Sequence, residues 1–263
     1  MTDVISKTAE DEFGIRSDPS DIERLRLYIF KKYGALNPET IKKVFISGEA
    51  ASFLTVNETY FFREPVHFSF LKNILSTYEE AEIQICSAAS STGCEAYSIA
   101  MLIEEFNRTS TKPLFYHIDA FDINQEVIKT ALQGVYTERV MRDDGSSFHY
   151  MTKPFLKKIK YGYEINASLK KNIRFFTHNL MDALYQEVYH IIFFRNAFIY
   201  FSQRARTQVL SNLSSALKEN GFLIMGVSET AGAHHENLEP KNKNDVFYFQ
   251  KTTPKKPAFD FTL

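Results

Sequence analysis

The residues best placed to do chemistry in this chain lie in and just after a turn of small side chains. Ser87 to Gly93 holds only small residues, so the backbone there can turn sharply and another molecule can approach it closely. The turn lacks the glycine patterns of dinucleotide-binding loops and of P-loops. Glu95 follows it, and a carboxylate there would repel a pyrophosphate. This combination favours a ligand with a cationic group, such as an amino or sulfonium centre.

The flanking residues predict a strand and a helix that would position this turn. Ile83 and Ile85 alternate with Gln84, which is typical of a short strand that enters the core. From about Cys94 onward, apolar residues recur with helical spacing. Strand, turn and helix form the first unit of a nucleotide-binding α/β sheet, in which the helix N-terminus faces the ligand. An ordinary strand–helix corner would have the same pattern.

Polar residues also end two later predicted strands. Asp122 ends the second strand, where sheets of this kind hydrogen-bond the hydroxyls of a ribose. It would equally serve as the N-cap of the predicted helix Gln125 to Leu132. Arg195 and Asn196 follow Val188 to Phe194, a fully apolar strand of the buried parallel kind. At the carboxyl end of such a strand, polar side chains line the ligand crevice.

The first 55 residues are predicted to form a small N-terminal helical region. Asp18-Pro19 and Asn37-Pro38 each place a capping residue before a proline, which indicates two helix starts. Phe13 and Ile15 are the expected docking points of the polar segment that precedes them. The exposed faces of these helices are basic. They are either solvated surfaces or docking surfaces for an acidic partner helix. The basic residues are Arg24, Arg26, Lys31, Lys32, Lys42 and Lys43.

A β-appendage is predicted between the helix after Asp122 and the strand Ile173 to Thr177, at about residues 155–177. Tyr161 to Ile165 has the pattern of a short hairpin rather than a helix. The lysines around it either protect an edge strand from aggregation or contribute to pairing with a partner. These lysines are Lys157, Lys158, Lys160, Lys170 and Lys171.

The C-terminal part of the chain is predicted to complete the sheet. Gln203 to Leu217 has the pattern of an amphipathic helix that Asn220-Gly221 closes. Phe222 to Val227 and Val246 to Gln250 are the expected final strands. The Lys- and Pro-rich tail after Lys251 is predicted to be loose.

The composition is that of a globular protein of 263 residues with 44% hydrophobic residues. A net charge of −1 argues against a non-specific nucleic-acid surface. Cys86 and Cys94 are the only cysteines, so a reducing cytosol fits better than a disulfide framework. No apolar run has the length of a bilayer span or the pattern of a signal peptide, so a cytoplasmic location is expected. No spacing predicts a catalytic triad or a metal site, and we expect no metal.

Taken together, these residues resemble the chemotaxis receptor methyltransferase (CheR) family, whose members transfer methyl from S-adenosylmethionine (SAM) to receptor glutamates. The resemblance runs in order through roughly residues 50–250, and the combination of motifs is specific although each is weak alone. The motifs are Asn57-Glu-Thr-Tyr-Phe-Phe-Arg63, Ser87-Ala-Ala-Ser-Ser-Thr-Gly93, Glu95-Ala-Tyr-Ser-Ile-Ala100, Asp122-Ile-Asn124, His178-Asn-Leu180, Arg195-Asn196 with Ile199-Tyr-Phe201, and Gly226-Val-Ser-Glu229.

The resemblance implies an α/β fold with a Rossmann-like class I methyltransferase sheet, formed by a SAM-dependent domain over residues 56–263. It implies SAM as cofactor, S-adenosylhomocysteine as product, and a methyl-accepting chemotaxis receptor as protein substrate. We further expect a monomer that neither binds nucleic acid nor inserts into a membrane. Arg63 and Tyr200 match residues proposed to act on the substrate. The residues implied at the cofactor are Asn57, Thr59, Arg63, Ala88, Gly93, Glu95, Asp122, Asn179, Leu180, Arg195 and Asn196.

The chain departs from the family pattern in several places. Cys94 replaces an acidic residue of the turn, which is expected to weaken the hold on the methionine end of the cofactor. His190 and Phe194 replace the usual Asp and Cys of the strand before Arg195. The helical region before Asn57 is also shorter than the family's receptor-binding domain.

The expected reaction asks the protein mainly for positioning. A glutamate side chain has a pKa of about 4.3 in water, so it is already a nucleophile at neutral pH. The leaving group is a sulfonium, so no general acid is required. The protein must place the carboxylate in line and remove its water. An arginine fork and a tyrosine hydroxyl suit that task.

The alternative function is a non-catalytic binding module that kept the fold as a SAM sensor or a receptor scaffold. Cys94 and the short N-terminal region favour this alternative. Arg63, Asp122 and Tyr200 favour the enzyme. Methyl transfer to nucleic acid or to a small molecule lacks a basic surface or a substrate motif to support it.

Overall fold

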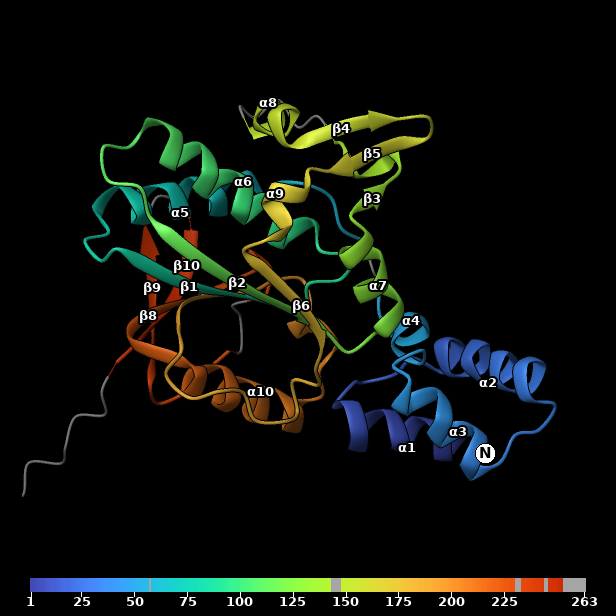
Figure 1. The fold of residues 1–263 in the computed structure, drawn as a ribbon. Helices are drawn as coiled ribbons and strands as arrows, with labels where there is room; N and C mark the ends of the chain where they lie inside the picture. Colours follow the sequence, from blue (N-terminus) through green and yellow to red (C-terminus); the bar gives the residue numbers. More distant parts are fainter. Residues whose placement is uncertain (57, 143–147, 230–232, 244–245, 253–263) are drawn as a thin grey trace, which may run out of the picture.

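The computed structural model describes residues 1–56, 58–142, 148–229, 233–243 and 246–252. Its centre is a seven-stranded sheet of order β6-β2-β1-β7-β8-β10-β9 (Figure 1). Neighbours from β6 to β8 are parallel, whereas β10 runs antiparallel to both β8 and β9. This mostly parallel α/β sheet confirms the predicted fold class. The strands are β1 Glu82–Ala88, β2 Phe115–Asp122, β6 Ile173–Thr177, β7 Tyr189–Phe194, β8 Leu217–Met225, β9 Leu238–Lys243 and β10 Val246–Lys251.

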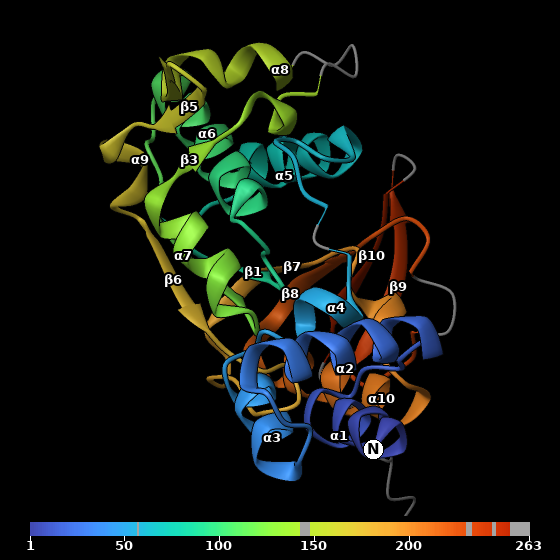
Figure 2. The same cartoon turned by 90° about the vertical axis from the view of Figure 1, so that its right-hand side faces the viewer.

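Helices cover both faces of this sheet (Figures 1 and 2). On one face, α5 (Pro65–Thr77) and α6 (Cys94–Thr109) share an apolar cluster with Ile83 and Ile85 of β1. On the other, α10 (Gln203–Ala216) packs with the second cluster, which contains alternate residues of the same strand. Because successive side chains of a strand point to opposite faces, strands that feed two clusters read as near-continuous apolar runs.

Four helices form a lobe beside the sheet, with an apolar cluster of their own (Figure 2). Asp18 and Asn37 cap two of them through their side chains, as the sequence predicts. The first helix was not predicted, because its buried face is narrow: Ile5, Ala9 and Phe13 recur every fourth residue in a polar segment. The helices are α1 Thr2–Phe13, α2 Pro19–Tyr33, α3 Pro38–Ile46 and α4 Ala51–Leu54.

Acidic residues of the lobe neutralise most of its basic face. Four of the six basic residues form ion pairs of 2.5–2.8 Å. Exposed pairs add little stability, but they cancel much of the field that would attract an acidic partner. The structure therefore favours the solvated interpretation of this face. The pairs are Arg24–Asp21, Arg26–Glu23, Lys32–Glu49 and Lys43–Glu39.

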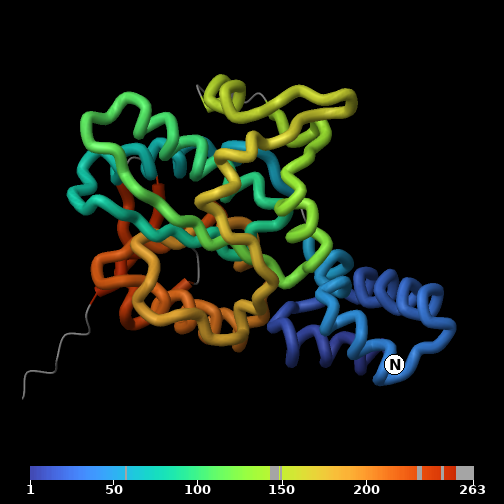
Figure 3. Tube along the Cα trace, viewed as in Figure 1, coloured from blue at the N-terminus to red at the C-terminus, as the bar shows by residue number. Residues whose placement is uncertain are grey.

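The inserted segment forms a separate three-stranded sheet of order β3-β5-β4, which projects from the main body (Figure 3). β4 (Leu156–Ile159) and β5 (Gly162–Ile165) form the predicted hairpin, and β3 (Val135–Tyr136) pairs with β5. The predicted boundary at residue 177 runs too far, because Ile173–Thr177 belongs to the main sheet. The remaining helices are α7 Gln125–Gln133, α8 Phe148–Met151 and α9 Ala167–Lys170.

The C-terminal part differs from the prediction in two places. Asn220-Gly221 does not close α10, which ends at Ala216; both residues lie within β8, where Asn220 has a left-handed φ of 62°. β9 was missed because its sequence, Leu-Glu-Pro-Lys-Asn-Lys, is polar and largely exposed. The loose tail after Lys251 lies outside the described residues, apart from Thr252. Within the described ranges, no helix has the length and apolar character that crossing a bilayer requires.

Candidate active site

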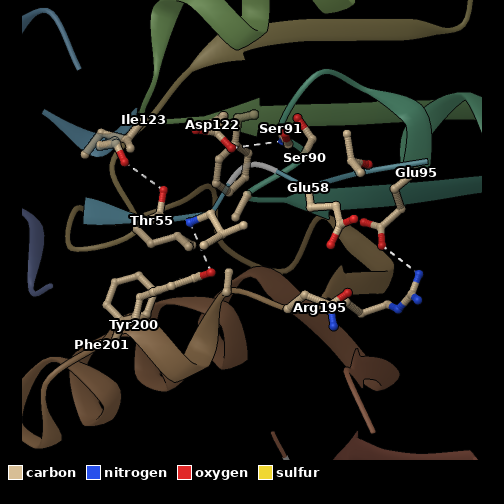
Figure 4. A pocket seen from close by; sticks show the side chains of 18 of the residues that line it. Thr55, Glu58, Ser90, Ser91, Glu95, Asp122, Ile123, Arg195, Tyr200 and Phe201 are labelled. Atoms are coloured by element: carbon tan, nitrogen blue, oxygen red, sulfur yellow. Dashed lines mark hydrogen bonds and ion pairs between the residues drawn. The ribbon is translucent and has the colours of Figure 1, made fainter. Parts of the chain in front are cut away.

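A cavity opens at the carboxyl ends of β1, β2, β6 and β7 (Figure 4). Counted with its open mouth, it has a volume of about 990 Å³, which is sufficient for a ligand of nucleoside size. Its walls come from the β1–α6 turn, from the loops after the other three strands, and from the N-terminal lobe.

Most residues that the sequence assigned to a site line this cavity. They are Thr59, Arg63, Glu95, Asp122, Asn179, Leu180, Arg195, Asn196 and Tyr200. Ala88 and Gly93 do not line it. Gly93 is the left-handed N-cap of α6, where an added Cβ would lie 2.9 Å from Ala131 and from Phe175, so its role is close packing. Asn57 lies outside the described residues.

The β1–α6 turn has an unusual backbone that brings its N–H groups to the end of β2. Ala89 and Ser91 have positive φ values of 57° and 49°. Ser90 N–H donates to the carbonyl of Phe121 (2.8 Å), and Ser91 N–H donates to Asp122 Oδ2 (2.9 Å). Non-glycine residues in this region are strained and cluster at functional sites. The sequence indicated the turn through its small residues, but not this backbone.

The alternative in which Asp122 is the N-cap of α7 is wrong. Asn124 caps that helix, because its side chain accepts from Glu126 N–H. The Asp122 carboxylate instead accepts from the N–H groups of Ser91 and Asn124, the latter at 3.0 Å. Burial raises its pKa, against the lowering effect of these N–H groups. A carboxylate has about four acceptor sites, so acceptor capacity remains beyond these N–H groups, and Asp122 lines the cavity.

Arg195 is the centre of a buried charge network. Its side chain is 2% exposed, and its guanidinium lies 3.0 Å from Glu95 and 3.4 Å from Glu64. It also donates to the carbonyl of Arg63 (2.5 Å) and lies 5.7 Å from the centre of the Phe68 ring. The network joins β7, α6 and the segment before α5, so it fixes one end of the cavity.

Glu95 belongs to this network and also lines the cavity. One oxygen accepts from Ser87 Oγ (2.7 Å) and the other faces Arg195 (Figure 4). Burial raises the pKa of Glu95, although Arg195 opposes the shift. Its charge is therefore largely compensated within the protein. Burial is the largest single influence on the pKa of Glu64 and raises it, but Arg195, the Asn196 amide and His67 together outweigh burial, so the pKa is lowered.

Glu229 organises the loop after β7, a role that the sequence did not reveal. Its buried carboxylate accepts from the N–H groups of Asn196 (2.5 Å), Gly226 (3.1 Å) and Ile199 (3.3 Å). A Cβ on Gly226 would lie 2.6 Å from this carboxylate, so the approach requires glycine. Asn196 has a φ of 59°, and its amide donates to Glu64 (3.0 Å). The spacing of Gly226 and Glu229 was the available signal.

Arg63 and Tyr200 lie at the cavity with side chains that are only partly buried. Arg63 donates to the carbonyl of Glu58 (2.6 Å), and its guanidinium lies 5.8 Å from the centre of the Tyr60 ring. The Tyr200 hydroxyl accepts from Val56 N–H (3.1 Å). Neither side chain is enclosed in the buried network, so both can reach a molecule in the cavity.

The three residues that replace family residues, Cys94, His190 and Phe194, lie outside the cavity wall. Cys94 is fully buried beneath the turn, where burial raises the pKa of its thiol to about 12. His190 accepts from Gln84 N–H (2.9 Å) and lies 2.9 Å from Lys218 Nζ. Phe194 is buried against α10. The expected loss of contact with the cofactor through Cys94 therefore has no geometric support.

Comparisons with known proteins agree with this geometry. Residues 57–247 match the family model described as "CheR methyltransferase, SAM binding domain". A chemotaxis protein methyltransferase of Borreliella burgdorferi is 34% identical over 204 residues, which cover 71% of this chain and 68% of that protein. A chemotaxis protein methyltransferase of Listeria monocytogenes is 28% identical over 237 residues, which cover 87% and 88%. The chain belongs to the CheR family of SAM-dependent methyltransferases.

Proposed function

We propose that this protein transfers methyl from SAM to glutamate side chains of a methyl-accepting chemotaxis receptor, and releases S-adenosylhomocysteine. The observation that carries the proposal is one cavity that holds Asp122, the strained β1–α6 turn and the two partly exposed side chains of Arg63 and Tyr200. The relatives of Borreliella burgdorferi and Listeria monocytogenes are chemotaxis protein methyltransferases, which supports a role in chemotaxis.

The residues of the cavity fit the cofactor from end to end. The buried Asp122 carboxylate, with unused acceptor sites, would hold the ribose hydroxyls. The small turn would let the cofactor approach the backbone N–H groups. Asn179 and Leu180 would lie beside the base, and the end with Thr59, Asn196 and Arg195 would hold the amino-acid part. When bound, SAM supplies a methyl group on a sulfonium, a good leaving group.

The chain's own residues would position the methyl acceptor. The Arg63 guanidinium would pair with the substrate carboxylate, and the Tyr200 hydroxyl would donate to it. Both would fix the attacking oxygen in line while the apolar wall excludes water. No protein side chain needs to accept a proton, because the acceptor is already ionised at neutral pH.

The alternative is a SAM sensor or receptor scaffold without activity. The position of Cys94 outside the cavity wall removes one of its supports. The deciding experiment incubates the protein with SAM that carries a radiolabelled methyl group and membranes that contain candidate receptors. Label that is released by base identifies a glutamate methyl ester. SAM binding without base-labile label would favour the sensor or scaffold.

We also propose the organisation that would accompany this activity. Residues 1–55 would be a helical region and residues 56–263 the SAM-dependent domain with its appendage. The separate apolar cluster of the lobe supports this division. The free thiols of Cys86 and Cys94 support a cytoplasmic location, and the protein would act as a monomer.

Replacing Asp122 with alanine is expected to weaken binding of S-adenosylhomocysteine by about 1–3 kcal/mol or more, because a buried charge-assisted hydrogen bond to ribose is lost. Calorimetry measures the affinity. Asp122→Asn, which keeps the shape and one acceptor, is the matched variant and should lose less. Unchanged affinity in Asp122→Ala would rule out the ribose assignment.

Reversing the charges of Lys157 and Lys158 is expected to weaken receptor methylation if the appendage recognises the receptor. Both lie on β4, an edge of the small sheet and remote from the cavity, so affinity for S-adenosylhomocysteine should not change. Methyl transfer to receptor membranes is compared for K157E/K158E and for the control K241E/K243E on β9, the edge strand of the main sheet. Full activity of K157E/K158E would leave the lysines only a protective role.

A further inference from the structure

Part of the cavity wall comes from the N-terminal lobe, outside the segment that matches the family model. Phe13, at the end of α1, and Ile15, just after it, line the cavity together with Ala51 of α4. Phe13 is 5% exposed and Ile15 is 4% exposed. Residues 57–247 make up the matched segment, so these two side chains lie outside it.

Backbone hydrogen bonds hold this segment firmly against the loop after β7. Ile15 forms an antiparallel bridge with Phe201. Arg16 N–H donates to the carbonyl of Tyr200, and Ser202 N–H donates to the carbonyl of Gly14, both at 2.8 Å. Gly14 has a φ of 69°, and a Cβ there would lie 2.5 Å from Ala205 Cβ. The turn therefore needs glycine, and its position leaves Ile15 no freedom to leave the wall.

The same lobe also contacts the loops after β6 and β2. Asn179 Nδ2 donates to the carbonyl of Glu12 (2.7 Å), one residue before Phe13. Asn124 Nδ2 donates to Ser52 Oγ (2.6 Å), and a Cβ on Gly48 would lie 2.0 Å from the carbonyl oxygen of Ile123. The lobe thus contacts the loops after β7, β6 and β2, and Phe13 and Ile15 lie at the β6 and β7 contacts.

The polarity of the cavity indicates which part of a ligand meets these side chains. Figure 4 shows Glu95 and Arg195 at one end, Asp122 in the middle, and Ile123 and Phe201 at the other end, while the hydroxyl of Tyr200 is directed towards the middle. SAM has the same order, with a charged amino acid, a ribose and a purine. The contact between Asn179 and Glu12 places Phe13 next to the loop after β6, on the apolar side.

We infer that Phe13 and Ile15 are cofactor-binding residues that pack against the purine ring, so the N-terminal lobe sets the affinity for the nucleoside. The inference rests on the proposed function, because it takes SAM as the ligand. A purine has two apolar faces, and an aromatic and a branched aliphatic side chain are suitable surfaces for them. The lobe is thus part of the cofactor site as well as a candidate region for substrate contacts.

The test measures the affinity of the full chain for S-adenosylhomocysteine by calorimetry. Phe13→Ala and Ile15→Ala should each weaken binding about tenfold or more, because apolar contact area with the purine is lost. The same loss is expected for adenosine as the probe, which contains the purine but no amino acid. Ile22→Ala is the matched control: Ile22 is 2% exposed in the same cluster but does not line the cavity, so its affinity should stay at the wild-type value.

Thermal unfolding of each variant separates direct contact from loss of the lobe. If an alanine variant does not fold, Phe13→Leu or Ile15→Val, which retain most of the apolar packing volume, take the place of that variant in the same measurement. Equal losses in Ile22→Ala would show that only folding of the lobe matters, and would overturn the inference. So would wild-type affinity in both cavity variants. A wild-type protein that binds no S-adenosylhomocysteine would instead refute the proposed function itself.

Discussion

Replacing Arg195 with methionine is expected to lower the free energy of unfolding by about 3–5 kcal/mol, because it leaves two largely buried carboxylates without their cation. The Arg195 side chain is 2% exposed and pairs with Glu95 and Glu64. Methionine has a similar length and keeps much of the contact with Phe68, so the change removes mainly the charge. Urea unfolding measures the difference.

Two comparisons identify the cause of this loss. Arg108→Met removes an exposed arginine that pairs with Glu105 and should change stability by less than about 1 kcal/mol. The double variant Arg195→Met with Glu95→Gln should regain part of the stability, because one uncompensated charge is removed as well. The buried-charge explanation would be contradicted if Arg195→Met lost no more unfolding free energy than Arg108→Met. It would also be contradicted if the double variant were less stable than Arg195→Met.

The pH dependence of Arg195→Met follows from the direction of the Glu95 shift. Burial already raises the pKa of Glu95 while Arg195 opposes the shift, so the variant should raise it further. A carboxyl whose pKa is higher in the folded state binds more protons there than in the unfolded chain. Stability then falls as pH rises above the unfolded value of about 4.3. The deficit of Arg195→Met relative to wild type should therefore be smaller near pH 5 than near pH 7.

The sequence predicts the sheet well because apolar periodicity and turn residues are local signals. Ile83 and Ile85, and the apolar run before Arg195, lie in β1 and β7 as expected. β9 and α1 were missed for the opposite reason: both are polar over most of their length and are held by tertiary contacts. Propensity and pattern are weak where packing decides the structure.

The candidate site shows the same division between local and tertiary information. The order of the motifs predicted that Asp122 and Arg195 lie at one cavity, and both line it. The reason is that the carboxyl ends of neighbouring parallel strands meet at one edge of the sheet. The pairing of Glu95 with Arg195 joins residues that are 100 positions apart, and nothing in either local sequence indicates it. Likewise, Phe13 reaches the cavity only because the lobe folds back over it.

Arg63→Ala and Tyr200→Phe are expected to reduce the turnover of receptor methylation by about 100-fold while affinity for S-adenosylhomocysteine changes much less. Misplacement of a reacting group by about 1 Å costs a factor of this size, and the proposed work of both side chains is on the acceptor carboxylate. Tyr200→Phe removes the hydroxyl that accepts from Val56 N–H. Because Val56 is 69% exposed, its N–H can bond to water instead. The backbone carbonyl of Arg63 that Arg195 uses is retained in Arg63→Ala.

Methyl transfer at saturating SAM and calorimetry with S-adenosylhomocysteine are measured on the same preparations, so turnover and binding are read separately. Arg139→Ala and Tyr185→Phe are matched controls, since both residues are exposed and neither lines the cavity; both should keep wild-type turnover. Loss of cofactor affinity in parallel with turnover in Arg63→Ala would show that this arginine holds the carboxylate of the cofactor instead. The acceptor would then depend on Tyr200 for its orientation, and Tyr200→Phe alone would lower turnover without a change in binding.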